Sequence, residues 1–435
     1  MRKIVIIGAG SFNFTCAISR DIFTFPALAD SNIVLVDIPE GVDRMEAARI
    51  VIEKTIQKGG YPGSVYATFN RSEALAGADA VMITIRNDLT IDAWSRDLAI
   101  PKKYGVDTVI GDTRGPSGIF RFLRSASALL DICRDIEKYA PEAAVLNYTN
   151  PMDMICSYIR KMTHLNITGL CHSVQGTASM LAQWIEADIR DITYLCAGIN
   201  HQAFFLEYKW KGRNAYPDIK EAIKKEEIYK KEMVRNEMFR ALGYYPTESS
   251  GHNSEYNAWF RKRPNLIEKY CPDSYASSVR IITEREKTRD EKMKQIVDSD
   301  GMDLSRGKEY AASILNALLG DGTLFEFNGN VENKGLITNL PEGATVEVPV
   351  TASKAGLRPY GIGNLPRHLA ALNNQNAQAE ELAVEGCIEG DRNKIYLAAV
   401  CDPLTGAVCS LAEIRAMVDE MFEENQESLK ALNFR

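Results

Sequence analysis

"KIVIIGAGS" (Lys3–Ser11) lies at the start of the chain and decides the fold of its first half. Four consecutive β-branched residues predict a strand that is buried on both faces, as strands of parallel sheets are. Two glycines follow at once, with the spacing of a tight turn from a strand into a helix. Backbone N–H groups in such a turn, together with the helix N-terminus, bind a pyrophosphate. The stretch therefore predicts a dinucleotide-binding βα unit.

Four residues are expected to contact the dinucleotide: Gly8, Gly10, Ser11 and Asp37. Asp37 ends the second predicted strand, where a carboxylate accepts hydrogen bonds from both ribose hydroxyls and repels a 2′-phosphate. We therefore expect NAD as the cofactor rather than NADP. Asn13 stands where the GxGxxG pattern has its third glycine, so a tight turn without a cofactor is the alternative.

Short apolar segments rich in Val and Ile alternate with helical patterns in the first half, which predicts a Rossmann-like, doubly wound α/β sheet. From about residue 190 the pattern changes to longer strands and charged helices, and the C-terminal third is helical. We expect a NAD-binding domain over residues 1–190 and a mixed α+β domain for substrate binding and oligomerisation over residues 191–435. The expected strands are 3–8, 32–37, 80–85, 144–150 and 166–171, then 192–200, 204–210, 322–333 and 344–353.

The composition is that of a soluble globular protein, with 45% hydrophobic and 25% charged residues. A formal net charge of −7, without a basic stripe, argues against nucleic-acid binding. No apolar stretch approaches the ~20 residues of a membrane span. Nine cysteines in a chain of this length form no disulfide framework, so we expect reduced thiols in a cytoplasmic protein.

Four polar residues lie where predicted strands or segments end: Asp112, Asn150, Cys171 and His201. Ligands of open α/β sheets gather beyond the carboxyl ends of the strands, so these side chains are expected to meet near the nicotinamide. A thiolate with an imidazole favours zinc on chemistry alone. The alternative is that Cys171 is a small buried hydrophobic residue and His201 a hydrogen-bonded core residue.

The sequence resembles glycoside hydrolase family 4 over nearly its whole length. The motifs that carry the resemblance occur in family order: "IGAGS", "NYTNPM", "GLCHSVQGT", "GINH" and "NLPEGATVEVPV". Within the family, "CHSVQGT" and "TESSGHNSEYNAWF" (Thr247–Phe260) are most similar to the α-galactosidase branch. The resemblance implies an α-galactosidase that needs NAD and a divalent metal, usually Mn²⁺, in an overall fold like that of lactate and malate dehydrogenases.

The resemblance also implies an oxidative route to glycoside cleavage, outside the usual scheme with two carboxylates. The sugar is oxidised at C3 by NAD⁺, a base removes the acidified C2 proton, and the C1 leaving group is expelled. Water then adds, and NADH reduces the ketone. Cys171 and His201 would bind the metal, which would be manganese instead of zinc, and Asn150 would bind the sugar hydroxyls.

The proton-transfer residues are likewise implied by the resemblance. His172 stands at the position of the acid that protonates or orients the leaving group. The base is expected to be a tyrosine, either Tyr244 or Tyr256, and Asp112 matches an acid that supports it. A tyrosine needs nearby positive charge to act as a base at neutral pH.

Two arginines depart from the α-galactosidase pattern and suggest other substrates. Arg86 lies in "IRNDL" (Ile85–Leu89), where a glycine pair is typical, and Arg114 lies where an apolar residue is expected. Both could pair with a substrate carboxylate, which makes an α-galacturonide or similar uronoside an alternative, or both could form structural ion pairs. Trp94 replaces the arginine of members that act on phosphorylated sugars, so a 6-phosphosugar glycoside is less favoured.

"NYTNPMD" is also similar to a strand end of lactate and malate dehydrogenases, so a 2-hydroxyacid dehydrogenase is the alternative of another class. A catalytically silent NAD-binding regulator is a third. The Cys171–His201 pair and the long second domain argue against the dehydrogenase, and a regulator would tolerate the loss of that pair. The expected partners are a small-molecule glycoside and further copies of the chain, in a homodimer or homotetramer.

Overall fold

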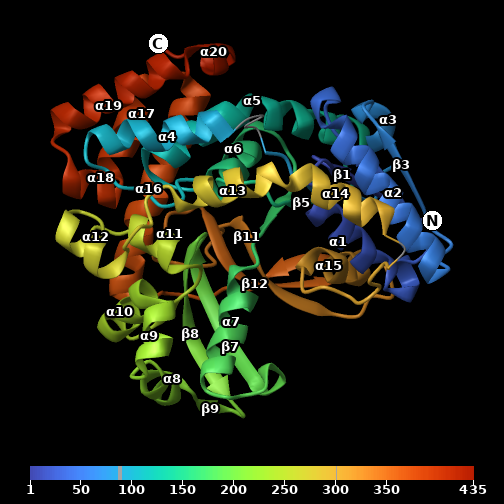
Figure 1. The fold of residues 1–435 in the computed structure, drawn as a ribbon, viewed down its shortest axis with the longest axis horizontal. Helices are drawn as coiled ribbons and strands as arrows, with labels where there is room; N and C mark the ends of the chain where they lie inside the picture. Colours follow the sequence, from blue (N-terminus) through green and yellow to red (C-terminus); the bar gives the residue numbers. More distant parts are fainter. Residues whose placement is uncertain (87–90, 300) are drawn as a thin grey trace.

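The computed structural model describes residues 1–86, 91–299 and 301–435, through which one large sheet runs (Figure 1). The parallel part of the sheet has the strand order of a Rossmann-like doubly wound fold, so the predicted fold class is confirmed. In order across the sheet, these strands are β3 (Ser64–Thr68), β2 (Asn32–Val36), β1 (Lys3–Ile7), β4 (Ala80–Ile83), β5 (Ala144–Asn147) and β6 (Ile167–Leu170).

Helices cover both faces of the parallel strands, as the continuous apolar sequence of β1 requires. Val5 and Ile7 pack into the core under one helical layer, and Ile4 and Ile6 into the core under the other. The first layer contains α5 (Gly115–Tyr139), α6 (Met152–Met162), α16 (Arg367–Glu389), α17 (Arg392–Cys401) and α19 (Leu411–Glu424), and the second α1 (Phe12–Phe23), α2 (Val42–Gly59) and α15 (Tyr310–Leu319).

The second half of the chain extends the same sheet with antiparallel strands. From β6 outward these are β11 (Phe325–Glu332), β12 (Thr345–Ser353), β7 (Ile192–Ile199), β8 (Gln202–Trp210) and β10 (Tyr245–Pro246). The predicted domain division at residue 190 falls in the turn before β7, and it stays a prediction.

The strand β3 is the element of the parallel sheet that the sequence does not predict. It lies at the sheet edge, and none of its residues is fully buried, so it lacks the apolar run of its neighbours. Elsewhere the predicted strands are found with shifted ends. None of the described helices is long and apolar enough to span a bilayer.

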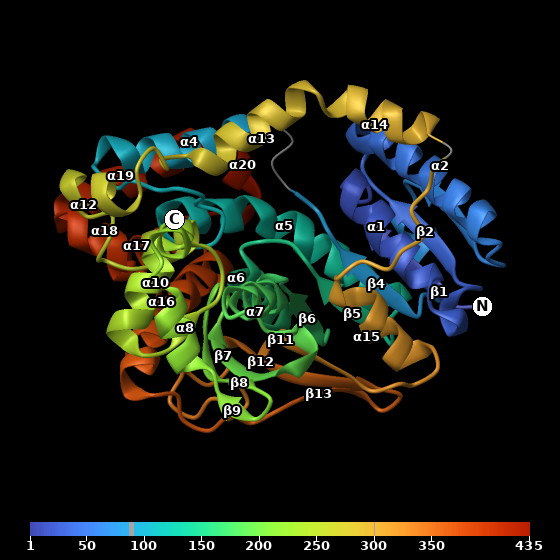
Figure 2. The ribbon, with the colours of Figure 1, turned by 60° about the horizontal axis from the view of Figure 1, so that its bottom comes forward.

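Two helices of the second half cross over the first half (Figure 2). They are α13 (Ser277–Lys287), which packs against α4 (Ile91–Lys103), and α14 (Arg289–Asp298), which packs against α2. We call residues 277–298 the strap.

A buried arginine holds the segment before the strap to the first half. Arg261 is 1% exposed, forms an ion pair with Asp107, and donates to the Asp107 carbonyl oxygen at 2.7 Å and to Ser274 Oγ at 2.9 Å.

Replacing Arg261 by Met should destabilise the fold by about 3 kcal/mol, since the buried Asp107 carboxylate loses one of its two cationic partners and keeps only Lys102, which is exposed. Urea unfolding followed by circular dichroism measures the effect. The control is Arg263→Met, which removes an exposed arginine two residues away and should change stability by less than about 0.5 kcal/mol. Equal effects of the two substitutions would contradict the assignment.

Glu347 is a fully buried carboxyl group in the middle of the sheet. It lies on β12, opposite Asn330 of β11 and Gly198 of β7, and neither of its oxygens has a hydrogen-bond partner among the described residues. Burial, with a smaller effect of the Glu248 charge, raises the pKa of Glu347 to about 8. The side chain is therefore mostly neutral at pH 7.

This pKa predicts a pH dependence of stability. The folded-state pKa of Glu347 lies above the unfolded value, so its contribution is complete below about pH 4 and is lost as the pH rises toward 8. Glu347→Gln keeps the shape of the side chain and is neutral at every pH. The wild type should lose unfolding free energy on the order of 1 kcal/mol per pH unit as the pH rises toward 8, and the variant should not show this loss. Unfolding of both proteins at pH 5 and pH 8 tests this, and equal losses in the two would refute it.

Candidate active site

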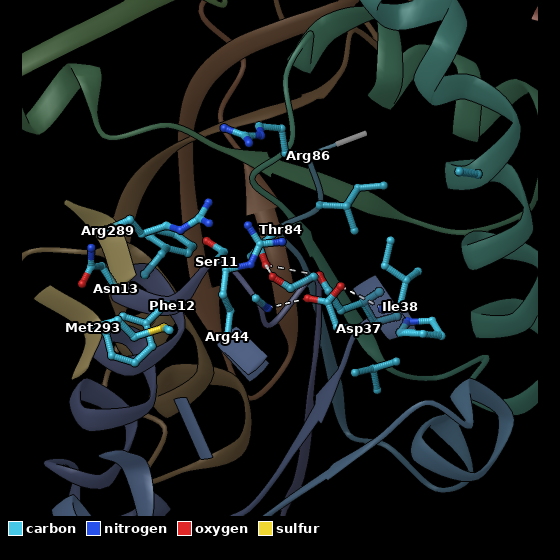
Figure 3. Close-up of a pocket in the computed structure, with 18 of the residues that line it drawn as sticks. Ser11, Phe12, Asn13, Asp37, Ile38, Arg44, Thr84, Arg86, Arg289 and Met293 are labelled. Atoms are coloured by element: carbon cyan, nitrogen blue, oxygen red, sulfur yellow. Dashed lines mark hydrogen bonds between the residues drawn. The ribbon is translucent and has the colours of Figure 1, made fainter. Parts of the chain in front are cut away.

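The turn between β1 and α1 forms one wall of a cavity of about 1020 Å³ (Figure 3). Gly8 has a φ of +91°, and a Cβ there would come within 2.8 Å of the Thr84 and Ile85 backbone. A Cβ on Gly10 would lie 2.8 Å from Asp37 Oδ2. Position 8 therefore requires glycine, and a side chain at position 10 would displace the Asp37 carboxylate; without side chains the backbone of the turn is open to the cavity.

Asp37 holds this turn in place from the end of β2. Its carboxylate accepts from the backbone N–H of Gly10 and, at 2.8 Å, from that of Ile38. Ser11 precedes α1 without a side-chain capping bond, and the first turn of the helix has no acidic residue. No acidic residue of α1 itself therefore offsets the positive potential of its N-terminus, which faces the cavity and suits an anion.

Arg86 lies in this cavity and not among the polar residues at the ends of β6 and β7. Its Nη2 atom is 3.2 Å from Glu286 Oε1 of the strap. Residues 87–89 of the predicted "IRNDL" feature lie outside the described part of the chain.

A second group of reactive side chains lies at the ends of β6 and β7. Cys171 Sγ is 3.8 Å from Glu248 Oε1, and His201 Nε2 is 3.9 Å from the same oxygen. One ligand atom from each residue lies within 4.8 Å of the others. The structure thus brings Cys171 and His201 together and adds a carboxylate that sequence reasoning missed.

His252 links Glu248 to Asp112, and sequence reasoning missed this residue as well. Its Nδ1 is 3.3 Å from Glu248 Oε2, and its Nε2 is 3.4 Å from Asp112 Oδ1. Asp112 Oδ2 accepts from Asn150 Nδ2 at 3.4 Å, so Asn150 joins the group. Next to Asn150, Thr149 donates to the Ile85 carbonyl oxygen at 3.0 Å, which connects the group to the wall of the dinucleotide cavity.

Opposite charges compensate burial in this group. Burial disfavours the charge of His252, yet Glu248 and Asp112 raise the His252 pKa well above its ordinary value. Burial would raise the pKa of Asp112 and of Glu248, but the nearby histidines, above all His252, hold both below their ordinary values. His252 is therefore an imidazolium between two carboxylates at neutral pH.

Cys171 and His201, the two predicted metal ligands, have pKa values shifted toward their neutral forms. Burial lowers the pKa of His201 to about 4, so its imidazole is neutral and keeps a lone pair for a cation. Burial, with the Glu248 and Glu347 carboxyls, raises the pKa of the Cys171 thiol well above its ordinary value. The thiol is therefore protonated at neutral pH.

The two candidate tyrosines lie in different places. Tyr256 is fully buried with its hydroxyl 3.4 Å from His201 Nδ1, whereas Tyr244 packs against Tyr216 and His368. Burial raises the pKa of Tyr256 well above its ordinary value, and the nearby carboxylates add to the shift. Of the two tyrosines, the structure brings Tyr256 to the group at the ends of β6 and β7.

His172 and Arg114 are oriented differently from the other candidates. The His172 side chain is 72% exposed, and its Nδ1 is 3.9 Å from Glu309 Oε1. Arg114 is buried, with Nε 2.7 Å from Glu380 Oε1, a second contact to the Asn200 carbonyl oxygen, and its guanidinium over the Tyr256 ring. Arg114 therefore has an internal partner for its charge.

A sequence signal for the two missed residues exists in "TESSGHNSEY". Glu248 and His252 are spaced four apart there, and His252 is one of only five histidines in the chain. Serine and glycine between them gave no helical pattern, although α11 (Ser250–Glu255) forms at this place.

Comparisons with known proteins agree on one family. The model described as "Family 4 glycosyl hydrolase" matches residues 3–187, and "Family 4 glycosyl hydrolase C-terminal domain" matches residues 196–405. An α-galactosidase of Bacillus subtilis (strain 168) is 37% identical over 428 residues, covering 97% of this chain and 98% of that protein.

Two solved structures show the same fold. A 6-phospho-α-glucosidase from gut microorganisms, solved in complex with NAD and Mn²⁺, aligns with a TM-score of 0.83 at 20% identity, covering 98% of this chain and 99% of that chain. Malate dehydrogenase of Cryptosporidium parvum aligns with a TM-score of 0.52 at 17% identity, covering 88% and 98%. The dehydrogenase-like overall fold is thus confirmed, but this second likeness concerns the fold alone.

Both halves of the sequence match the same family, and the similarity to the Bacillus protein extends over nearly the full length of both chains. The chain therefore belongs to glycoside hydrolase family 4.

Proposed function

We propose that this protein is a NAD- and Mn²⁺-dependent glycosidase that cleaves an α-galactoside. The observation that carries the proposal is the close approach of a thiol, an imidazole and a carboxylate, connected through Thr149 and Asn150 to a cavity of dinucleotide size. The α-galactosidase name of the Bacillus relative supports the substrate, and the NAD and Mn²⁺ of the 6-phospho-α-glucosidase complex support the cofactors.

The cavity fits a dinucleotide. Gly8 and Gly10 leave room for the pyrophosphate where a Cβ would collide with the protein, and the first turn of α1 faces it without an acidic residue. Asp37 keeps its carboxylate at the end of β2, the position that suits the ribose hydroxyls of NAD.

Cys171, His201 and Glu248 fit a divalent cation by the chemistry of their donor atoms. His201 is neutral, Glu248 is ionised, and the Cys171 proton can be displaced on binding. Manganese accepts imidazole and carboxylate ligands, and its preference over zinc is taken from the named complex. Bound NAD⁺ would supply the oxidant for sugar C3, and the bound cation a Lewis acid for the neighbouring sugar oxygens.

The protein's own residues would position the sugar and move protons. Tyr256 is our candidate for the base at C2, because its hydroxyl adjoins His201 and the Arg114 guanidinium lies over its ring. The phenol is protonated in the structure as described, so it needs added positive charge nearby to act. Asn150 would bind sugar hydroxyls, Asp112 and His252 would fix the orientation of this group, and the exposed His172 would serve the leaving group.

The positions of the two unusual arginines favour a neutral sugar. Arg114 forms an ion pair with Glu380, and Arg86 lies in the dinucleotide cavity beside Glu286. Each of these two arginines already has a carboxylate partner, so neither is placed to bind the carboxylate of a uronoside. A cytoplasmic location and a homodimer or homotetramer remain predictions from the sequence.

The reaction itself distinguishes this proposal from its alternatives. The protein is incubated with nitrophenyl α-galactoside, NAD⁺ and Mn²⁺ in D₂O under reducing conditions. Cleavage with deuterium at C2 of the released sugar and no net NADH is the expected result. Net NADH with an intact glycosidic bond would indicate a dehydrogenase, and the absence of any turnover a regulator.

The control uses two cysteine variants. Cys171→Ser should lower the affinity for Mn²⁺ and the turnover by at least about a hundredfold while leaving NAD⁺ binding unchanged. Cys401→Ser, on α17 and outside the group, should change neither the Mn²⁺ affinity nor the turnover. Full metal-dependent turnover by Cys171→Ser would show that the ligand assignment is wrong.

The substrate prediction needs its own measurement. We expect kcat/KM for nitrophenyl α-galactoside to exceed that for the corresponding α-galacturonide by at least about tenfold, because the buried Arg114 has Glu380 as partner. A preference for the galacturonide would instead favour the uronoside alternative.

A further inference from the structure

The strap presents one continuous helical face to the dinucleotide cavity. Its residues that line the cavity recur at spacings of three and four, the period of an α-helix. They are Ile282, Arg285, Glu286, Arg289, Lys292, Met293 and Ile296.

Two residues of this face pack in part against the protein, Ile282 on the cluster of Trp94 and Leu98 and Met293 on the core that contains α1 and α2, and none of the seven is fully buried. None of the residues of α14 is buried, and Ile296 remains 38% exposed although it points to the cavity. Hydrogen bonds hold the strap at its two ends: Ala276 donates to the Thr108 carbonyl oxygen at 2.9 Å, and Lys54 donates to that of Val297 at 2.7 Å. The middle of the strap therefore forms one wall of the cavity.

The charge of the cavity is suited to an anionic ligand. Six basic and three acidic side chains stand among the residues that line it. Arg289 is at the centre of the strap, and in Figure 3 its side chain and that of Arg44 both reach toward Ser11 at the start of α1. Glu286 Oε1 is 3.4 Å from Arg289 Nη1 and 3.2 Å from Arg86 Nη2, and Arg289 Nε donates to Asp290 Oδ1 at 3.0 Å, so these carboxylates orient both guanidinium groups at the cavity.

Resting on the proposed function, we propose that the strap is part of the cofactor site and that Arg289 binds the dinucleotide pyrophosphate opposite the N-terminus of α1. Two phosphates then have the α1 backbone on one side and a guanidinium on the other, the geometry in which arginine forms charge-assisted hydrogen bonds. Lys292, one turn further along, adds positive charge, and Met293 and Ile296 cover the ligand with apolar surface.

The test is calorimetric titration of the full-length protein with NAD⁺ and with ADP-ribose, which has the pyrophosphate without the nicotinamide. Arg289→Ala should raise the Kd of both ligands by about tenfold or more, as expected for the loss of a hydrogen bond to a charged group. Arg289→Lys should recover most of this affinity. At high salt the Kd values of the alanine variant and of the wild type should lie closer together, because salt screens the arginine charge.

Lys294→Ala is the matched control. Lys294 lies on the same helix and is exposed, but it does not line the cavity, so its loss should change the Kd by less than twofold. Mn²⁺ binding should be unchanged in all variants, which excludes a general disruption of the fold. Binding of NAD⁺ by Arg289→Ala within twofold of the wild type overturns the role of the strap and leaves the proposed function standing. Failure of the wild-type protein to bind NAD⁺ overturns both.

Discussion

The carboxylate of Glu248 lies close to three side chains: Cys171 and His201 from earlier parts of the chain, and His252 four residues further on. One oxygen lies 3.8 Å from Cys171 Sγ and 3.9 Å from His201 Nε2, and the other 3.3 Å from His252 Nδ1. An ionised carboxylate at this depth is costly unless an opposite charge accompanies it. The His252 imidazolium provides that charge, and its other ring nitrogen pairs with Asp112. The geometry of the candidate metal ligands therefore depends on a buried ion pair that contains neither of the two residues predicted to bind the metal.

The dinucleotide cavity depends on a different constraint, which is the absence of side chains. A Cβ on Gly8 would collide with the backbone of Thr84 and Ile85, and one on Gly10 would displace the Asp37 carboxylate that holds the turn. The opposite wall is built from the strap, whose polar and apolar side chains line the cavity and are at most partly buried. One wall of the cavity is thus backbone without side chains, and the other is a helical face of charged and apolar side chains.

Much of the fold could be predicted from the sequence, because it follows from local pattern. The buried strands β1, β2, β4, β5 and β6 carry the apolar runs that parallel sheets need, and the edge strand β3 was missed because it does not. The placement of Cys171, His201, Asn150 and Asp112 followed from the rule that ligands gather at strand ends. Glu248 and His252 could not be placed in this way, since they come from the loop and short helix after β10.

The sequence by itself determined the Rossmann-like sheet, the dinucleotide turn and the family motifs, because these depend on residue types at short spacing. It also predicted that Cys171 and His201 meet, because both end predicted strands. The tertiary structure alone decided which tyrosine adjoins His201 and that Arg114 is paired with Glu380. It also decided that Arg86 faces the dinucleotide cavity and that the strap covers this cavity. The physical reason is that burial and charge pairing between residues 55 to 266 positions apart follow from packing, which no local pattern encodes.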